Sequence, residues 1–340
     1  MHSHNTLQVK KINVELVKNT LKAAGTGTKA SIAGLTKLSV ATCGTILNEL
    51  AATGEVIELE PDESHGGRPA KQYRYNSNFG YAVCLLVRAE GGRFWIRCSA
   101  VNLSGEPVQT ETLHLETIGM ETIDSLIGRL ITEFGNVQAI GIGIPGVVHS
   151  GKIGVCDVPE LAGAPLGPYL EEKYGMEITI ENDMNMTVYG LYHLQRFEED
   201  TTFAVVTFPA NQFPGAGFIV NGGIVSGNTH FGGEVSFLPF GLTREEQLER
   251  LHTEDGFIPL AVNILSSVIV MINPAAIAIT GELPREAQLD ELYAGCLNYI
   301  PEEHMPALFI KNNTEEEYMT GLVTATLESL TYRLQLIARR

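Results

Sequence analysis

Residues 139–146 read Ala-Ile-Gly-Ile-Gly-Ile-Pro-Gly, an apolar run that ends in a proline and a glycine. A short continuous apolar run bounded by turn residues is typical of a strand buried on both faces. A second predicted strand, 177–181, ends in Asn182 and Asp183. Ligands of open α/β sheets bind beyond the carboxyl ends of the strands, so these two strand ends predict a ligand site.

The flanking segments complete an α/β body of two lobes. Before residue 200, apolar spacing predicts three more strands and a helix, at 81–88, 93–102, 111–116 and 120–134. After residue 200 it predicts two strands and three helices, at 203–208, 217–220, 256–272, 290–299 and 315–338. We therefore expect lobes over 80–200 and 201–320, with a C-terminal helical segment, 321–340, that packs back on the first lobe.

The first 79 residues follow a different pattern. Three helices and then two strands are predicted, at 5–24, 28–36, 40–53, 56–59 and 72–75. The hydroxyl of Ser39 can cap the third helix, and the stretch Gly-Gly-Arg-Pro at 66–69 lies between the two strands. This order predicts a winged helix-turn-helix domain over residues 1–79.

Charge is distributed unevenly along the chain, whose formal net charge is −17. Residues 1–79 hold nine Lys and Arg against seven Asp and Glu, whereas the remainder holds 14 against 33. Only the front of the chain is electrostatically suited to approach DNA phosphates, and the acidic body should be held away from them.

Two segments of the N-terminal region carry the predicted DNA contacts. In a helix-turn-helix the recognition helix places its N-terminal residues against base edges, which nominates Ser39, Ala41, Thr42, Thr45 and Asn48. An arginine between glycine and proline suits a wing that enters a minor groove, which nominates Gly67, Arg68, Pro69 and Lys71. The alternative is that this module mediates protein contacts or dimerisation only.

Cysteine usage and hydropathy indicate the compartment. The five cysteines are scattered and never spaced as Cys-x-x-Cys, which predicts reduced thiols and no metal site built from them alone. The apolar stretch 260–272 is interrupted by Asn263, Ser266 and Ser267, and no signal-peptide pattern precedes the first helix. We expect a cytoplasmic protein without membrane insertion.

Four short motifs occur in a fixed order along the chain: Gly-Gly-Arg-Pro at 66–69, Gly-Ile-Gly-Ile-Pro-Gly at 141–146, Glu-Asn-Asp-Met-Asn at 181–185, and the glycine-rich run at 221–234. Together with the winged helix, this order resembles the repressor members of the ROK (repressor, open reading frame, kinase) family over nearly the full length. The resemblance implies a two-lobed, actin-like body of the sugar kinase type, with sugar bound between the lobes.

The chain departs from the devices that the resemblance implies for kinase members. Arg88 stands where the family has the aspartate of Asp-x-Gly-Gly-Thr, and residues 209–217 replace a Gly-Thr-Gly-rich turn. Residues 279–282, Ile-Thr-Gly-Glu, replace a Gly-Gly pair near the adenosine. Ser236-Phe237 replaces the family's Gly-His, and no cysteine knuckle for zinc follows in 240–251. We therefore predict no kinase activity, no cofactor and no metal.

The residues at the predicted sugar-binding positions match the family pattern better than those at the predicted nucleotide-binding positions. Asp183 stands at the family's catalytic base position, and without ATP this remnant can only bind. Glu234 matches a family glutamate that contacts sugar hydroxyls. The ligand candidates are Gly146, Asn182, Asp183 and Glu234. The structural alternatives are a helix cap for Asn182 and Asp183 and a carboxylate at a helix N-terminus for Glu234.

The predicted function is that of a DNA-binding transcriptional regulator, a repressor, that acts as a homodimer or homotetramer on a palindromic operator. A sugar or sugar-derived ligand between the lobes is its expected effector. Two other functions stay open: an active sugar kinase of the ROK type with an atypical ATP site, and a scaffold or regulator that acts without a ligand.

Overall fold

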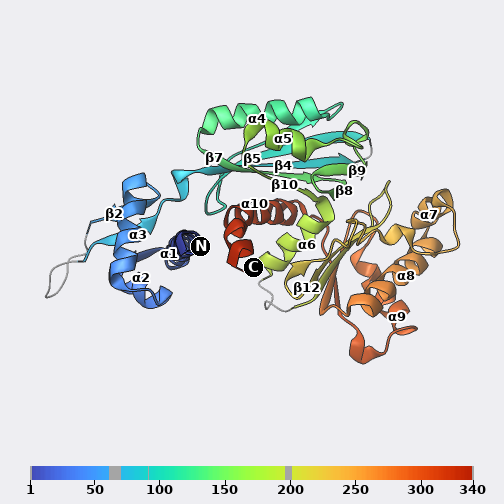
Figure 1. The fold of residues 1–340 in the computed structure, drawn as a ribbon. Coiled ribbons are helices and arrows are strands. Elements are labelled where there is room, and N and C mark those ends of the chain that lie inside the picture. Colours follow the sequence, from blue (N-terminus) through green and yellow to red (C-terminus); the bar gives the residue numbers. More distant parts are fainter. Residues whose placement is uncertain (1, 61–69, 91, 196–200, 339–340) are drawn as a thin grey trace.

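The computed structural model describes residues 2–60, 70–90, 92–195 and 201–338. A small N-terminal unit lies beside a larger body built on two sheets (Figure 1). The N-terminal unit consists of α1 (His2–Ala24), β1 (Thr26–Thr28), α2 (Lys29–Thr36), α3 (Val40–Thr53), β2 (Val56–Leu59) and β3 (Gln72–Tyr75). The predicted bounds of α3, β2 and β3 are confirmed, whereas β1 was not predicted.

The helices of the N-terminal unit begin and end where their capping residues require. Thr28 and Ser39 accept hydrogen bonds from the backbones of Ser31 and Thr42, and Gly54 ends α3 in the left-handed region at φ 88°. The three strands pair antiparallel in the order β1-β3-β2. The core beneath them is built around the fully buried side chains of Leu47 and Tyr73.

The first lobe is built on a five-stranded sheet in the order β10-β7-β4-β5-β6. Its strands and helices are β4 (Tyr81–Glu90), β5 (Arg93–Asn102), β6 (Pro107–Leu115), α4 (Met120–Phe134), β7 (Val137–Ile144), α5 (Leu166–Tyr174), β10 (Glu177–Asn182) and α6 (Asp183–Leu194), with the small hairpin β8 (Gly146–His149) and β9 (Lys152–Cys156). Strands β10, β7 and β4 run parallel, and β5 and β6 are antiparallel. The expected start of β6 at 111 was wrong, because the tight turn after Asn102 lets pairing begin at Pro107.

The glycines of the 139–146 run make room for a helix. α4 and α5 cover one face of the first sheet, and α10 (Glu315–Ala338) lies on the other (Figure 1). A Cβ atom on Gly141 would overlap Thr326, and one on Gly143 would overlap Tyr318, both on α10. The run therefore forms a buried strand, as predicted, and its glycines let the C-terminal helix pack closely on β7.

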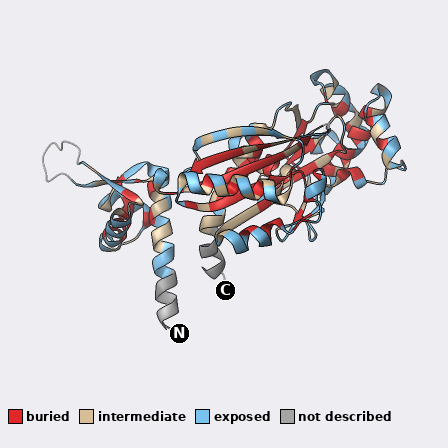
Figure 2. Ribbon diagram, turned by 90° about the horizontal axis from the view of Figure 1, so that it is seen from above, coloured by how far each residue is buried: buried red, intermediate tan, exposed pale blue. Residues whose placement is uncertain are grey.

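The second lobe is built on a sheet in the order β13-β12-β11-β14-β15. Its strands and helices are β11 (Phe203–Thr207), β12 (Gly215–Val220), β13 (Gly223–Ile224), α7 (Arg244–Leu251), α8 (Glu254–Ile272), β14 (Ala276–Thr280), α9 (Leu289–Leu297) and β15 (Ala307–Ile310). The sheet packs on α8 around Phe208, Leu265 and Ile277. Figure 2 shows the buried residues concentrated in the strands of the body.

Helix α8 is long and apolar enough over Asp255–Ile272 to cross a membrane by length and composition alone. In the fold it instead supplies Leu260, Ile264 and Val268 to the core of the second lobe. Its apolar character is accounted for by that packing.

Helices α6 and α10 lie between the two sheets and cross at very short range. A Cβ atom on Gly190 of α6 would overlap the carbonyl of Glu317, and one on Gly321 of α10 would overlap the carbonyl of Met186. Two glycines that face each other in this way let the backbones themselves touch. α6 also packs on β11 and β12 of the second sheet, so this crossing joins the lobes.

Candidate functional site

The exposed face of α3 carries three of the residues predicted to read DNA. Ala41, Thr45 and Asn48 are all exposed, and their spacing of four and three residues places them on one face of the helix. The opposite face, with Cys43, Ile46 and Leu47, is buried in the core of the N-terminal unit. This arrangement leaves one side of α3 open to a partner.

Ser39 and Thr42 have a structural task. The Ser39 Oγ accepts from the Thr42 backbone N–H at 3.0 Å and lies 2.8 Å from the Thr42 Oγ1. Both hydroxyls are therefore engaged in capping α3. The other three predicted residues, Ala41, Thr45 and Asn48, take no part in this cap and have exposed side chains.

Lys29 joins this face from the first position of α2. Its Nζ donates to the Asn48 Oδ1 at 2.8 Å and lies 5.7 Å from the centre of the Tyr73 ring. The sequence prediction overlooked this residue, although a lysine directly after the capping Thr28 was a visible signal. Lys29 brings a positive charge to the face that Asn48 occupies.

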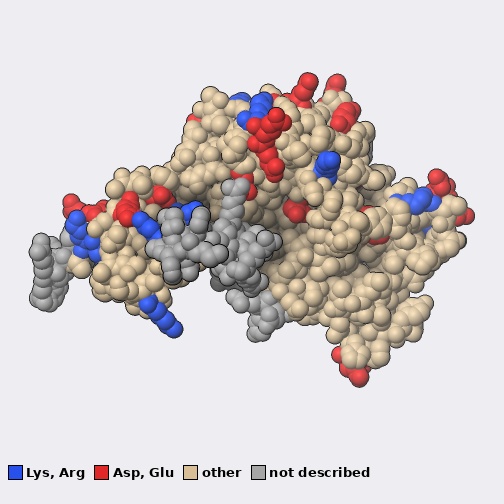
Figure 3. Space-filling model, in the orientation of Figure 1, with Lys and Arg blue, Asp and Glu red and all other residues tan. Residues whose placement is uncertain are grey.

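The hairpin of the N-terminal unit is described only in part. The predicted wing residues Gly67, Arg68 and Pro69 lie outside the described residues. Lys71 is described, and its Nζ lies 2.6 Å from the Glu58 Oε2. This hydrogen bond lowers the pKa of Glu58 and raises that of Lys71. On the face in view, Lys and Arg alternate with Asp and Glu over the N-terminal unit (Figure 3).

At the edge of the first sheet, the structure brings Asn182 and Gly146 together. The Asn182 Oδ1 accepts from the backbone N–H groups of Met184 and Asn185, at 2.8 and 3.1 Å, and so caps α6. Its Nδ2 donates to the Gly146 carbonyl at 2.9 Å. Both ends of this amide are engaged within the protein, which favours the structural alternative for Asn182.

Asp183 faces a cation that the sequence reading did not connect with it. The Arg88 Nη1 lies 3.6 Å from the Asp183 Oδ2, and the Arg88 guanidinium lies 4.7 Å from the centre of the Tyr318 ring. Burial raises the pKa of Asp183, and Arg88 acts in the opposite direction. Arg88 is thus held between an aromatic ring and a carboxylate.

Two further carboxylates face Asp183 and form with it the interlobe acidic cluster, defined as Asp157, Asp183 and Glu234. Burial, followed by the charges of Asp183 and Glu234, raises the pKa of Asp157 to about 6. Burial and Asp183 likewise raise the pKa of Glu234, which Arg244 opposes. The cluster combines residues of both lobes and carries more negative charge than its two arginines neutralise.

A glutamine joins the lobes beside this cluster. The Gln212 Nε2, from the loop between β11 and β12, donates to the Ala89 carbonyl at 2.9 Å and to the Asp157 Oδ2 at 3.1 Å. This loop includes the residues at which the resemblance would place a glycine-rich phosphate turn. Here it forms a direct bridge to the first lobe.

The position of the family's Gly-His motif is aromatic and cationic. The Arg244 guanidinium lies 3.4 Å from the centre of the Phe213 ring and 4.4 Å from that of Phe237. Phe237 is 58% exposed and contacts the half-exposed Phe231. Within the described ranges, no group of three or more His, Cys, Asp or Glu side chains could hold a metal ion.

The acidic cluster predicts a pH dependence of stability. The pKa of Asp157 is raised from 3.8 to about 6 on folding, so its stabilising contribution is present below the lower value and lost as pH rises through the higher one. Asp157→Asn should therefore raise the melting temperature at pH 7.5 and change it little at pH 5. The Asp157 residue is accessible to solvent even though neighbouring groups desolvate its carboxyl, so solvent screening reduces the effect and we expect about 1 kcal/mol or less, a shift of roughly 2–4 °C. Melting curves at both pH values test this, and equal gains at both would contradict it.

Comparison with known proteins gives these residues a family. The family model described as ROK matches residues 88–245. This segment is a ROK domain. The ROK domain contains Arg88, Asp157, Asp183 and Glu234, so the whole acidic cluster and its cation lie within the matched residues.

Curated relatives of two kinds resemble the chain. The xylose repressor of Bacillus subtilis is 25% identical over 239 residues, which cover 68% of this chain and 61% of the repressor. The N-acetyl-D-glucosamine kinase of Vibrio parahaemolyticus is 33% identical over 132 residues, covering 38% of this chain and 43% of the kinase. The chain thus spans about three fifths of the length of the repressor that it matches.

Solved structures share the fold of the ROK domain and its surroundings. A ROK family transcriptional regulator, described as a homologue of the E. coli MLC protein, has a TM-score of 0.65 at 17% identity, covering 96% of this chain and 99% of its own. The ROK hexokinase of Thermus thermophilus has a TM-score of 0.57 at 18% identity and covers 74% of this chain and 99% of its own. At these identities the likeness concerns the fold alone.

Proposed function

We propose that this protein is a DNA-binding transcriptional regulator, a repressor, of the ROK type. The observation that carries the proposal is the exposed face of α3, with Ala41, Thr45, Asn48 and the adjacent Lys29, on a unit attached to a ROK domain. The similarity to xylose repressors supports it. The hexokinase fold leaves about a quarter of this chain uncovered, whereas the regulator fold covers 96% of it.

In this proposal, residues 1–79 form a winged helix-turn-helix domain. The three helices and the β2–β3 hairpin support that assignment, and α3 is its recognition helix. Lobes of 80–200 and 201–320 follow, and we assign the C-terminal segment 321–340 to the first lobe, an assignment that the packing of the described part of α10 on β4 and β7 supports. The protein acts in the cytoplasm as a homodimer or homotetramer, so that two α3 helices meet a palindromic operator.

Direct DNA binding tests the proposal. Fluorescence anisotropy with a duplex from the promoter next to the protein's own gene should give salt-dependent binding. Arg68→Ala should weaken that binding by about tenfold, because a minor-groove arginine is lost. If Arg68→Ala left the affinity for DNA unchanged at matched salt, the predicted wing would not contact DNA. The absence of any footprint on that promoter would favour a scaffold that acts without DNA.

The proposal includes no phosphoryl transfer. A catalytic base must be free to take a proton from the sugar hydroxyl, and here Arg88 pairs with Asp183 while Gln212 bridges the lobes beside it. A coupled assay of ADP release over a hexose panel should show no turnover. Turnover abolished by Asp183→Asn would instead establish the kinase alternative, which the partial similarity to N-acetyl-D-glucosamine kinase keeps in view.

A sugar or sugar-derived effector at the acidic cluster completes the proposal. Carboxylates such as Asp183 and Glu234 accept hydrogen bonds from sugar hydroxyls, and residues of both lobes contribute them. A ligand there would favour one arrangement of the lobes, and it can change DNA affinity only as far as it distinguishes that arrangement from another.

A further inference from the structure

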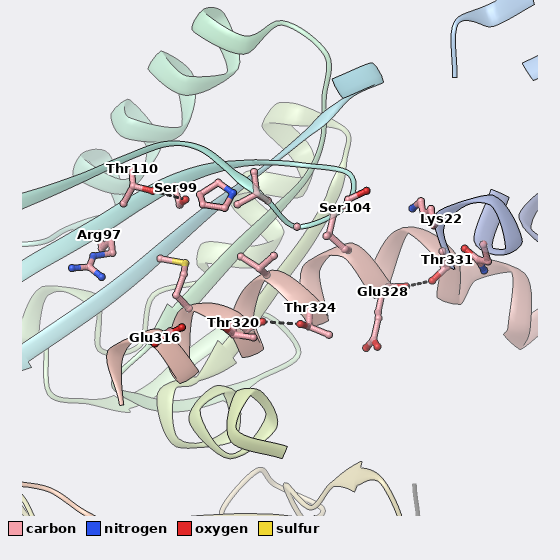
Figure 4. Close-up of a pocket in the computed structure, with 17 residues that line it drawn as sticks. Lys22, Arg97, Ser99, Ser104, Thr110, Glu316, Thr320, Thr324, Glu328 and Thr331 are labelled. Atoms are coloured by element: carbon pink, nitrogen blue, oxygen red, sulfur yellow. Dashed lines mark hydrogen bonds between the residues drawn. The ribbon is translucent and has the colours of Figure 1, made fainter. Parts of the chain in front are cut away.

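A cavity of about 730 Å³ lies where the N-terminal unit meets the first lobe. None of the residues that line it belongs to the acidic cluster. We call it the junction pocket. It is bounded by the end of α1, the outer half of the first sheet at β5 and β6, and one side of α10 (Figure 4). Its volume falls in the range of roughly 300–1,000 Å³ that is typical of small-molecule sites.

The polar groups of the junction pocket are mainly uncharged hydroxyls. Ser99 and Thr110 line it from the sheet, and Thr320 and Thr324 line it from α10 (Figure 4). The Thr324 hydroxyl donates to the Thr320 carbonyl at 2.8 Å, so its oxygen retains lone pairs that can accept from a ligand. With its proton engaged in this way, the Thr324 hydroxyl can accept a hydrogen bond from a hydroxyl group of a ligand.

Aliphatic side chains lie between these hydroxyls. Val101 and Val323 are buried, and Met319 and Leu327 are partly buried beside them on the pocket wall. A wall that alternates methyl groups with hydroxyls matches a sugar ring, whose C–H faces are apolar and whose rim carries hydroxyls.

The charges of the pocket are balanced in number. Its four charged residues are Lys22, Arg97, Glu316 and Glu328, two of each sign. The Lys22 Nζ donates to the Leu103 carbonyl at 3.1 Å, and Arg97 pairs with Glu315. Because the two cations and the two carboxylates offset each other, an ionic ligand of either sign would meet repulsion as well as attraction, and it would lose hydration on entering.

The pocket also lies at the interface where the N-terminal unit packs against the first lobe. Leu103, from the turn after β5, and Leu327, from α10, pack against the core of the N-terminal unit. Leu327 packs in addition against the core between α10 and the first sheet. A ligand that displaces Leu327 or Val323 would therefore change the surface on which the N-terminal unit packs.

We propose that the junction pocket binds an uncharged sugar of one or two rings. The bound sugar hydrogen-bonds to the serine and threonine hydroxyls and contacts the α10 aliphatic side chains. Its effect on DNA affinity rests on the proposed function, whereas the binding itself does not.

Isothermal titration calorimetry of the full chain without DNA tests the site. The probes are D-glucose, N-acetyl-D-glucosamine and sucrose, with glucosamine and glucose 6-phosphate as charged counterparts. We expect at least one neutral sugar to bind with a Kd of about 1 mM or tighter. Thr324→Trp, which fills the pocket, should weaken that binding at least about tenfold.

Thr132→Trp is the matched control. Thr132 lies on the outer helix α4 and, like Thr324, donates its hydroxyl to the carbonyl four residues before it at 2.8 Å. The Thr132→Trp variant should bind the sugar with unchanged affinity. The melting temperatures of both tryptophan variants show whether they are folded. Asp183→Asn locates the sugar: binding lost in this variant but kept in Thr324→Trp belongs to the acidic cluster and overturns the proposal.

Two other results would overturn it. One is the absence of heat with all three neutral sugars. The other is equal or tighter binding of the charged counterparts. Because no DNA is present, a negative result here leaves the proposed DNA binding to its own test.

Discussion

Asn48→Asp is expected to weaken operator binding about tenfold or more, since a single base contact is worth roughly 1–3 kcal/mol. The change preserves the shape of the side chain. It places a carboxylate on the exposed face of α3 and strengthens the hold on the Lys29 ammonium, which already donates to Asn48 at 2.8 Å. Both effects oppose the approach of DNA phosphates and bases. Fluorescence anisotropy at two salt concentrations measures the loss.

Asn263→Asp provides the same chemical change elsewhere. Asn263 is an exposed residue of α8 in the second lobe, remote from the N-terminal unit. Its variant should bind the operator as the unchanged protein does. If Asn48→Asp and Asn263→Asp lost DNA affinity equally, the effect would come from the total charge of the protein. That result would contradict the assignment of α3 as the recognition helix.

Gly321→Ala is expected to destabilise the fold by about 3 kcal/mol or more. The added Cβ would overlap the Met186 carbonyl, and a backbone atom on a packed helix cannot move aside as a flexible side chain can. α10 and α6 would have to separate, which opens the core around Tyr318 and Leu322. Urea denaturation should give a clearly lower midpoint.

Gly34→Ala separates this steric effect from the general effect of a helical alanine. Gly34 lies within α2, and a Cβ atom there would meet nothing within 4 Å. Alanine at that position should be neutral or stabilising by up to about 1 kcal/mol. Equal midpoints for the two variants would show that α6 and α10 do not cross as closely as described.

The sequence predicted those elements whose own residues define them. α3 and α4 have the bounds expected from their caps and apolar spacing, because Ser39 begins α3 and Gly54 and Gly135 end α3 and α4 locally. β14 and β15 were not predicted, since they are short runs that pair parallel with strands distant in the sequence, so no hairpin turn marks them. The short β1 depends likewise on pairing with β3.

The candidate site was predictable in part for a related reason. Asn182 and Asp183 follow a buried strand, so their place at the sheet edge could be read from the chain itself. The cation that faces Asp183 could not, because Arg88 and Tyr318 come from distant segments that only the folded sheet and α10 bring together. Arg88 was noticed as a departure from a motif, yet its partner was not.

Because α10 follows the second lobe in the chain, it becomes available to cover the first sheet late in synthesis. Ribosomes release β4 and β7 early, but α10, the helix that covers their inner face, is made only after the entire second lobe. Until then the glycine-bearing surface of β7 lacks its cover, and long-range contacts of this kind form slowly. During translation the first lobe should therefore be a substrate for chaperones and proteases, and it should become resistant only when α10 has left the exit tunnel.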